Sequence, residues 1–393
     1  METTRRNILK AAAALLVEGV VAARHPAFAQ QSPPRAGRKV ILVTCGGIRR
    51  EESFSATGVR HIPHLYQDLL PQGVFYPLIR NNGVTSHFNT ISSILTGHWQ
   101  HLDDWGKTPP ASPTLFEYLR KDRNLSQDQA WLISSNKALT NRIGASSVRD
   151  YGQPYGANVV FPKQLLIDAV VRAAQQGRAV RSADRASVLP ELEAMLETQN
   201  YEGLGWSVSG ETSALNPAAQ NAVQQAIHDL VSATSVPATG DEFTWLVSAE
   251  VMRRFAPSLL VITFSDMEVA HFGSYAMHVA GVRTVDRLVH ELWTHAQSLP
   301  AYRGNTTLFV LPEFGRDMDG STTNGFFNHR QNAESTRNTW MLALGQAAAK
   351  PQIVEQPVEQ IDICPTIASI FDLKAPGPAG NAQSGKVLPG LLL

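Results

Sequence analysis

Short apolar runs bounded by turn-forming residues recur along the chain, and they predict buried β-strands. The runs are residues 40–44, 74–79, 130–134, 259–264 and 308–311. The first run, Val-Ile-Leu-Val-Thr, is rich in β-branched residues, as is typical of a central parallel strand. Apolar residues at helical spacing occur in 113–120 and 279–297, which we expect to form amphipathic helices. This alternation of strands and helices indicates an α/β protein.

Residues 180–241 interrupt this alternation with a different composition. The segment is richer in Ala, Gln, Ser and Glu than its surroundings. We interpret it as a helical insertion or cap with polar loops. It falls within a folded region that covers residues 40–393, which is long enough to bury a large core.

The first 29 residues predict an export signal rather than a structural element. Arg5 and Arg6 lie in a twin-arginine pattern, a short apolar stretch covers residues 11–23, and Ala27-Phe28-Ala29 offers a cleavage site. A linker at 30–39 follows. We therefore expect a periplasmic or secreted protein that meets the twin-arginine translocase during export and has no membrane span in its mature form. The alternative is an ordinary basic N-terminal helix.

Charge and cysteine content narrow the classes of partner. The chain has 34 basic and 34 acidic residues, so no overall field favours nucleic acid or an anionic membrane. Any selectivity for anions must therefore be local. Cys45 and Cys364 are the only cysteines, and their apolar surroundings predict two buried thiols rather than a disulfide or a thiolate metal site.

The segment after residues 308–311 is rich in candidate chemistry. Glu313 leaves the end of this predicted strand, Arg316 follows, and His329 comes later in the sequence. Ligands bind at the carboxyl ends of parallel strands, so Glu313 and His329 are candidate metal ligands. Arg316 is a candidate for holding an anion, because guanidinium groups pair well with phosphate-like oxygens.

A second group of candidate metal ligands follows the run at 259–264. It consists of Asp266, Glu268 and His271. Carboxylates combined with imidazoles suit zinc and other first-row divalent metals, whereas oxygen-rich sites suit calcium or magnesium. We therefore expect a divalent metal, zinc, calcium or magnesium. The alternative is a strand end stabilised by hydrogen bonds alone.

Taken in order, these segments resemble the alkaline-phosphatase-like superfamily of phosphatases, sulfatases, phosphodiesterases and phosphomutases. In that superfamily a hydroxyl or thiol nucleophile begins a helix that ends in Leu-x-Thr-Gly or a close variant. Residues 95–97, Leu-Thr-Gly, match the helix end, and His87 lies at the usual distance of the nucleophile. A register shift would bring Thr85, Ser86 or Thr90 to that role. The alternative is that Thr85 or Ser86 is simply the helix N-cap.

Other positions depart from the superfamily pattern. Glycines occupy residues 46–47, where the superfamily has metal-binding aspartates, and Arg49 follows as a second candidate for holding an anion. Phe314 replaces an expected histidine. The motif Glu-Phe-Gly-Arg at 313–316, followed by Asn-His at 328–329, is most similar to a twin-arginine-exported branch with degenerate metal motifs.

The resemblance extends to Asp-x-x-Pro-Thr at residues 362–366, which is similar to the superfamily's C-terminal helix. It implies a doubly wound, mostly parallel α/β sheet with helices on both faces. It also implies an exported, metal-dependent hydrolase of small-molecule phosphate or sulfate esters, with a remodelled site of one metal. Because a fold does not fix an activity, a catalytically silent periplasmic binding or assembly component is the alternative.

Overall fold

The computed structural model describes residues 37–103, 106–163, 239–319, 325–330, 333–348, 350–373 and 384–392. The predicted signal peptide at 1–29, most of the linker at 30–39 and nearly all of the predicted insertion at 180–241 lie outside these residues. Within them, no helix is both long enough and apolar enough to cross a membrane.

The described residues form a nine-stranded sheet in the order β4-β3-β5-β1-β6-β7-β2-β8, with β9 pairing with β2. The strands are β1 Lys39–Cys45, β2 Gly73–Arg80, β3 Ala130–Ser134, β4 Asn158–Val160, β5 Leu259–Phe264, β6 Thr306–Pro312, β7 Asn338–Gly345, β8 Gln352–Ile353 and β9 Val358–Glu359. Strand β7 runs antiparallel to both of its neighbours, and the other described pairs are parallel. The sheet is therefore mostly parallel, as predicted.

Strand β1 lies between β5 and β6 at the centre of the sheet, and all seven of its residues are buried. Ile41, Val43 and Cys45 contribute to one apolar cluster, and Val40 and Leu42 contribute to the other. Successive side chains of a strand point to opposite faces, so a strand covered on both sides needs apolar residues at nearly every position. This explains the continuous apolar run in the sequence.

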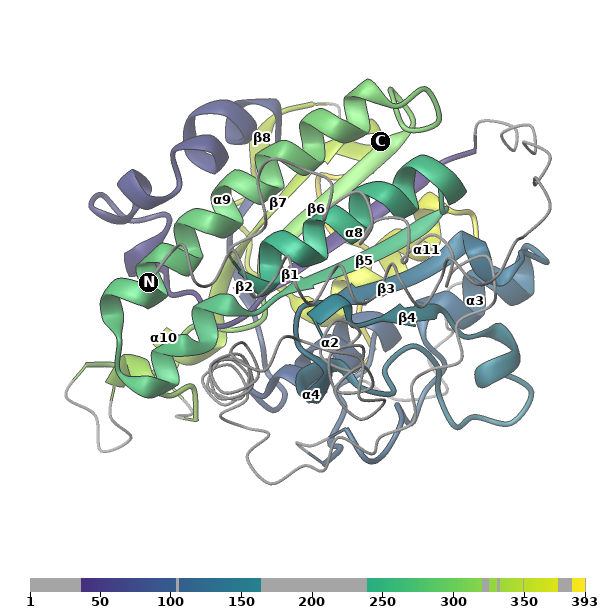
Figure 1. Cartoon of the computed structure of the whole chain (residues 1–393), viewed down its shortest axis with the longest axis horizontal. Helices are drawn as coiled ribbons and strands as arrows, with labels where there is room; N and C mark the ends of the chain where they lie inside the picture. The colour runs from purple at the N-terminus through teal and green to yellow at the C-terminus, as the bar shows by residue number, and fades with distance from the viewer. Residues whose placement is uncertain are drawn as a thin grey trace, which may run out of the picture.

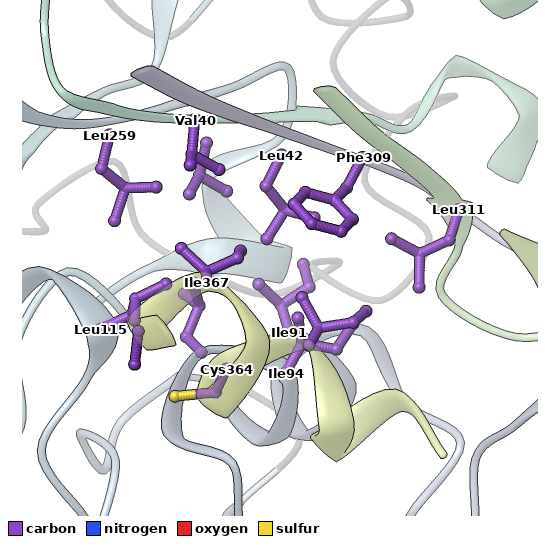
Figure 2. Packing of buried hydrophobic residues seen from close by; sticks show 14 of the residues in the cluster. Val40, Leu42, Ile91, Ile94, Leu115, Leu259, Phe309, Leu311, Cys364 and Ile367 are labelled. Atoms are coloured by element: carbon purple, nitrogen blue, oxygen red, sulfur yellow. The ribbon is translucent and has the colours of Figure 1, made fainter. Parts of the chain in front are cut away.

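Helices cover both faces of the sheet. The longer ones are α2 His87–Thr96, α3 Leu115–Asp122, α8 Gly240–Phe255, α9 Tyr275–Ser298 and α11 Ile363–Ile370. The α8 and α9 helices cover one face, on the viewer's side of the strands in Figure 1, whereas α2, α3 and α11 cover the other face. Figure 2 shows the second layer, in which strand residues such as Leu42 and Phe309 face Ile91 of α2 and Ile367 of α11. The predicted α/β fold with helices on both faces is confirmed.

Shorter helical segments connect these elements. They are η1 Arg50–Glu52, η2 Gly58–His61, η3 His64–Leu69, η4 Leu70–Gln72, α4 Lys137–Thr140, η5 Gln127–Gln129, η6 Gln153–Tyr155, η8 Asp266–Phe272, η9 Gly325–Phe327, α10 Glu334–Arg337, η10 Gln346–Ala348 and η11 Gln360–Asp362. The most relevant is η8, because it follows β5 directly and packs on α9.

The two cysteines are free and buried, as predicted. Cys45 ends β1 and belongs to the cluster under α8 and α9, whereas Cys364 in α11 belongs to the cluster on the opposite face. Burial raises the pKa of both thiols, so both stay protonated and unreactive.

Candidate metal centre

Four buried side chains meet where the carboxyl ends of β1, β5 and β6 come together. They are His87 at the start of α2, Glu268 and His271 in η8, and His329 in the segment after β6. One potential ligand atom from each lies within 4.8 Å of all the others. The group forms at this edge because β5, β1 and β6 are adjacent and parallel, so that the segments following them converge.

The three imidazoles point the same ring nitrogen toward one carboxylate oxygen. From Glu268 Oε2, the distances are 3.1 Å to His271 Nε2, 3.4 Å to His87 Nε2 and 4.0 Å to His329 Nε2. The Nε2 atoms of His271 and His329 are 3.2 Å apart. Three imidazole nitrogens and one carboxylate oxygen therefore surround one small volume.

Second contacts fix the orientation of two of these rings. His87 Nδ1 lies 2.6 Å from Glu313 Oε2, and His329 Nδ1 donates to the Thr85 carbonyl over 2.7 Å. Because a carbonyl can only accept, the Nδ1 of neutral His329 carries the proton and its Nε2 lone pair faces the group. Metal-binding histidines commonly have such a partner on their second nitrogen.

Glu268 is held by donors from two other segments. Its Oε1 accepts a hydrogen bond of 2.5 Å from the Gly47 amide, and its Oε2 accepts one of 2.6 Å from Arg316 Nη2. Burial would raise the pKa of this carboxyl, but the charges of Arg316 and His87 bring it well below its usual range. Glu268 is therefore an anion in the folded chain.

Electrostatics also separate the imidazoles. Burial disfavours charge on His87, but the nearby Glu268 and Glu313 carboxylates bring its pKa well above the ordinary value. For His329, burial and the charge of His87 lower the pKa far below the ordinary value. In the metal-free chain, His87 therefore carries the proton and His329 remains neutral, as a metal ligand must be.

The glycines at 46–47 make room for Glu268. A Cβ atom on Gly46 would collide with the Glu268 carboxylate and would lie 2.9 Å from the Met267 sulfur. A Cβ on Gly47 would lie 3.1 Å from both the Phe314 ring and a backbone carbonyl. The aspartates expected from the resemblance are thus absent from the end of β1, and a carboxylate from η8 reaches that position instead.

Phe314 fills the space where the resemblance predicts a histidine. Its ring stacks on His329, with centroids 4.2 Å apart and an angle of 24° between planes. It also meets the edge of His87 at 4.8 Å. Phe314 is fully buried, so it forms an apolar wall on one side of the ligand group and contributes no ligand.

Asp266, also predicted as a metal ligand, is not one of the four converging side chains. Its Oδ2 accepts a hydrogen bond of 2.7 Å from the Asp241 amide, while the Asp241 carboxylate accepts from the amides of Ser265 and Asp266. The two carboxylates thus satisfy the backbone donors at the starts of α8 and η8, where such donors lack partners within their own helix. Spacing alone could not separate this capping role from metal binding.

Glu313, another predicted metal ligand, also lies outside the group. It is fully buried behind His87 and is not one of the four converging side chains. Its Oε1 accepts from the Thr44 hydroxyl at 3.3 Å, and its other oxygen contacts His87 Nδ1. Glu313 therefore contacts the candidate ligand His87 rather than the shared volume itself.

The candidate hydroxyl nucleophiles all take part in local hydrogen bonds. Thr85 Oγ1 donates to the His329 carbonyl at 2.7 Å, and Thr90 Oγ1 accepts from Asn81 Nδ2 at 2.8 Å. Ser86 is the N-cap of α2 by position, but its hydroxyl accepts from the Asn89 side chain rather than from a helix amide. His87 is thus the first helical residue, at the position where the superfamily has its nucleophile.

The two candidate arginines have structural partners. Arg49 pairs with two carboxylates. Its Nε lies 2.9 Å from Glu52 Oε2, and its Nη1 lies 2.9 Å from Asp319 Oδ1. Arg316 is fully buried and binds Glu268 and the Gly47 carbonyl. In the described chain, Arg316 orients a candidate metal ligand and Arg49 joins two acidic side chains, and the role of either residue in holding a substrate anion stays a prediction.

Sequence reasoning missed a second group of possible ligands on the surface. His64 and Asp68 in η3 lie beside His290 of α9, with His64 Nδ1 2.8 Å from Asp68 Oδ2 and His290 Nε2 3.9 Å from the same oxygen. The spacing of His64 and Asp68 is a weak signal, because such pairs are common on exposed helices. All three side chains are more than a third exposed, in contrast to the buried group.

The fold is similar to that of solved structures from the alkaline phosphatase superfamily. A superfamily member from Vibrio parahaemolyticus aligns with a TM-score of 0.52 and 10% identity over 95% of this chain and 76% of its own. A phosphonate monoester hydrolase from Silicibacter pomeroyi aligns with a TM-score of 0.53 and 14% identity, over 89% of this chain and 76% of its own. A sulfatase from a Pseudoalteromonas species aligns with a TM-score of 0.52 and 11% identity, over 96% of this chain and 74% of its own. No family model matches the sequence, and no curated protein matches it.

Proposed function

We propose that this chain is a metal-dependent hydrolase of phosphate or sulfate esters whose remodelled site holds one divalent metal. The observation that carries the proposal is the convergence of His87, His271 and His329 on the Glu268 carboxylate within a buried site. Charged and polar groups are costly to bury even when they are hydrogen-bonded to one another, and a metal would offset that cost.

The donor set favours zinc or another first-row divalent metal over calcium or magnesium. Three imidazole nitrogens and one carboxylate oxygen form the candidate set, whereas calcium and magnesium prefer oxygen ligands throughout. When bound, such a metal supplies a Lewis acid that polarises an ester oxygen and lowers the pKa of water.

The surrounding residues prepare this chemistry. Glu313 holds His87 through Nδ1, and Thr85 holds His329 through Nδ1, so both rings are oriented before any metal binds. Arg316 and the Gly47 amide hold Glu268 in its anionic form. Phe314 stacks on His329 and covers one side of the group.

We infer that water is the attacking nucleophile. An imidazole stands at the usual position of the nucleophile, and Thr85 and Ser86 already have hydrogen-bond partners. His87, whose Nδ1 contacts Glu313, would release its Nε2 proton on joining the ligand set. This route needs no hydroxyl from the chain.

Export is part of the proposal. The twin-arginine motif at Arg5-Arg6 and the site at residues 27–29 support a periplasmic or secreted location. A twin-arginine route carries folded proteins, which suits a metal that is acquired before export.

The experiment combines turnover with metal replacement. We would strip the mature protein with a chelator, restore it with zinc, manganese or calcium separately, and assay aryl phosphate, phosphodiester and aryl sulfate substrates. We expect turnover to return with a first-row metal in the wild type and to stay absent in His271→Gln. The exposed variant His290→Gln, which alters the surface group, is the matched control. Stoichiometric metal without turnover on any substrate would favour the silent binding protein.

A further inference from the structure

An open cavity of about 390 Å³ lies beside the candidate metal centre. Its walls are formed by seven described residues: Asn82, Gly83, Val84, Thr85, His101, Arg330 and Arg337. Two of them carry a permanent positive charge, and none of the seven is acidic. A cavity with this lining attracts anions.

The cavity shares a wall with the metal centre. Thr85 lines the cavity, and its carbonyl accepts from His329 Nδ1 while its hydroxyl donates to the His329 carbonyl. Arg330, which also lines the cavity, follows His329 directly in the sequence. A molecule that occupied both places would therefore pass beside Thr85.

Hydrogen bonds within the chain hold parts of the cavity wall in place before any ligand binds. Arg337 Nη1 donates to the carbonyls of Asn81 and Gly83 at 2.7 and 3.0 Å, which holds its guanidinium against the 81–83 turn. The Asn81 side chain accepts from the Gly83 amide and closes that turn. On the other side, the Arg330 amide donates to Asp317 at 3.2 Å. Less side-chain freedom is lost on binding when a charged group is already held in place.

We propose that this cavity binds a second anionic group of the substrate, away from the ester that is cleaved. The substrate class is then an ester with two anionic groups, such as a phosphate or sulfate ester that also carries a carboxylate, sulfate or phosphate. This inference rests on the proposed function for the cleaved bond. The recognition of an anion by Arg330 and Arg337 does not depend on it.

The binding test uses inorganic sulfate and phosphate as probes with the metal-free mature protein. Titration calorimetry should show one site in the wild type. Arg337→Gln and Arg330→Gln should each weaken binding at least about tenfold, because each removes a charge-assisted contact. The second variant guards against loss of the 81–83 turn in the first.

Two controls separate this proposal from the metal centre. Arg303→Gln removes an exposed arginine that also binds backbone carbonyls, at Gln297 and Ser298, but lies outside the cavity lining. His271→Gln alters the metal centre at a residue that does not itself line the cavity. Both should bind the anions as the wild type does. Unchanged binding in both cavity variants, or no binding in the wild type, would overturn the proposal.

A kinetic comparison then tests the substrate class. The preference for an aryl ester bearing an extra carboxylate over the plain aryl ester should fall at least about tenfold in Arg337→Gln. An equal preference in wild type and variant would refute the second anionic group. If no ester is cleaved while anion binding still depends on Arg330 and Arg337, the hydrolase proposal fails and the anion site stands.

Discussion

At the scale of single residues, Glu268 is the centre of the candidate site. It brings a carboxylate to a position that the resemblance assigns to the end of β1, and its Oε2 lies within 4.0 Å of an Nε2 atom of each of the three imidazoles. The sequence does not show that the Glu268 carboxylate reaches this position, because its placement depends on the close approach that Gly46 allows between β1 and η8. A pattern along the chain records which residues are present, but not which one fills a given space.

Glu313 and Ser86 should respond very differently to substitution. Glu313→Gln keeps the shape but weakens the orientation of His87, so we expect metal affinity to fall by about ten- to a hundredfold, with turnover falling in parallel. Ser86→Ala should change the rate by less than about tenfold, since its hydroxyl bonds to a side chain away from the group. Metal titration and steady-state kinetics measure both. A covalent phospho- or sulfo-intermediate on Thr85, Ser86 or Thr90 would contradict the water route.

His278 should make the fold sensitive to acid. Burial lowers its pKa from 6.5 to about 4, so between these values the unfolded chain binds a proton that the folded chain does not. The free energy of unfolding should therefore fall as the pH drops from 6.5 to 4, by about 3 kcal/mol at most from this residue. Urea unfolding at several pH values measures it. The His278→Leu variant should show a shallower fall than the wild type, and an equal slope would refute the assignment.

At the scale of elements, the packing of η8 on α9 sets the position of Glu268 and His271. Gly281 of α9 lies so close to η8 that a Cβ there would come within 2.8 Å of the Met267 Cα and 2.9 Å of its nitrogen. Those are backbone atoms, which cannot rotate away. The two elements can touch at this point only because the helix has a glycine.

Gly281→Ala should therefore be destabilising, although the same change in an open helix stabilises by about 0.5–1 kcal/mol. We expect a loss of about 1–3 kcal/mol from overpacking, together with weaker metal binding as η8 shifts. Chemical denaturation and metal titration measure the two effects. Ala280→Ser, on the exposed side of the same helix, should change stability by less than about 0.5 kcal/mol. A stable Gly281→Ala variant with unchanged metal affinity would contradict this packing argument.

Element prediction succeeded where the pattern was long and apolar. The runs at 40–44 and 259–264 became β1 and β5, and the helical spacing at 279–297 became α9. The helix α8 and the antiparallel strand β7 were not predicted. Strands β8 and β9 have two residues each, too few for any periodicity to be visible.

At the scale of the whole molecule, the sequence predicted the sheet and its covering layers better than the site. Burial on both faces of β1 leaves a strong apolar signal, and that signal is independent of chemistry. Convergence at the sheet edge brought His271 and His329 close together, although the strands that they follow, β5 and β6, are separated by β1. Asp266 lies outside this group, and the sequence could not show this because capping and metal binding use the same type of side chain.

Export can be tested on the full chain. Replacing Arg5 and Arg6 by lysine keeps the charge but removes the guanidinium pair that the translocase receptor recognises. We expect the precursor to remain in the cytoplasm, measured by fractionation and immunoblotting. A single replacement of the exposed Arg303 by lysine is the control. Normal periplasmic accumulation of the double variant would overturn the export assignment.

The most direct test of a metal at the converging histidines is an anomalous difference map from crystals of protein that folded in its native host, recorded at the absorption edges of first-row metals. We predict one strong peak within the group of His87, Glu268, His271 and His329, at about 2.0–2.2 Å from the ligand atoms. A fully occupied peak at His64, Asp68 and His290 alone, or no peak in either group, would contradict the account.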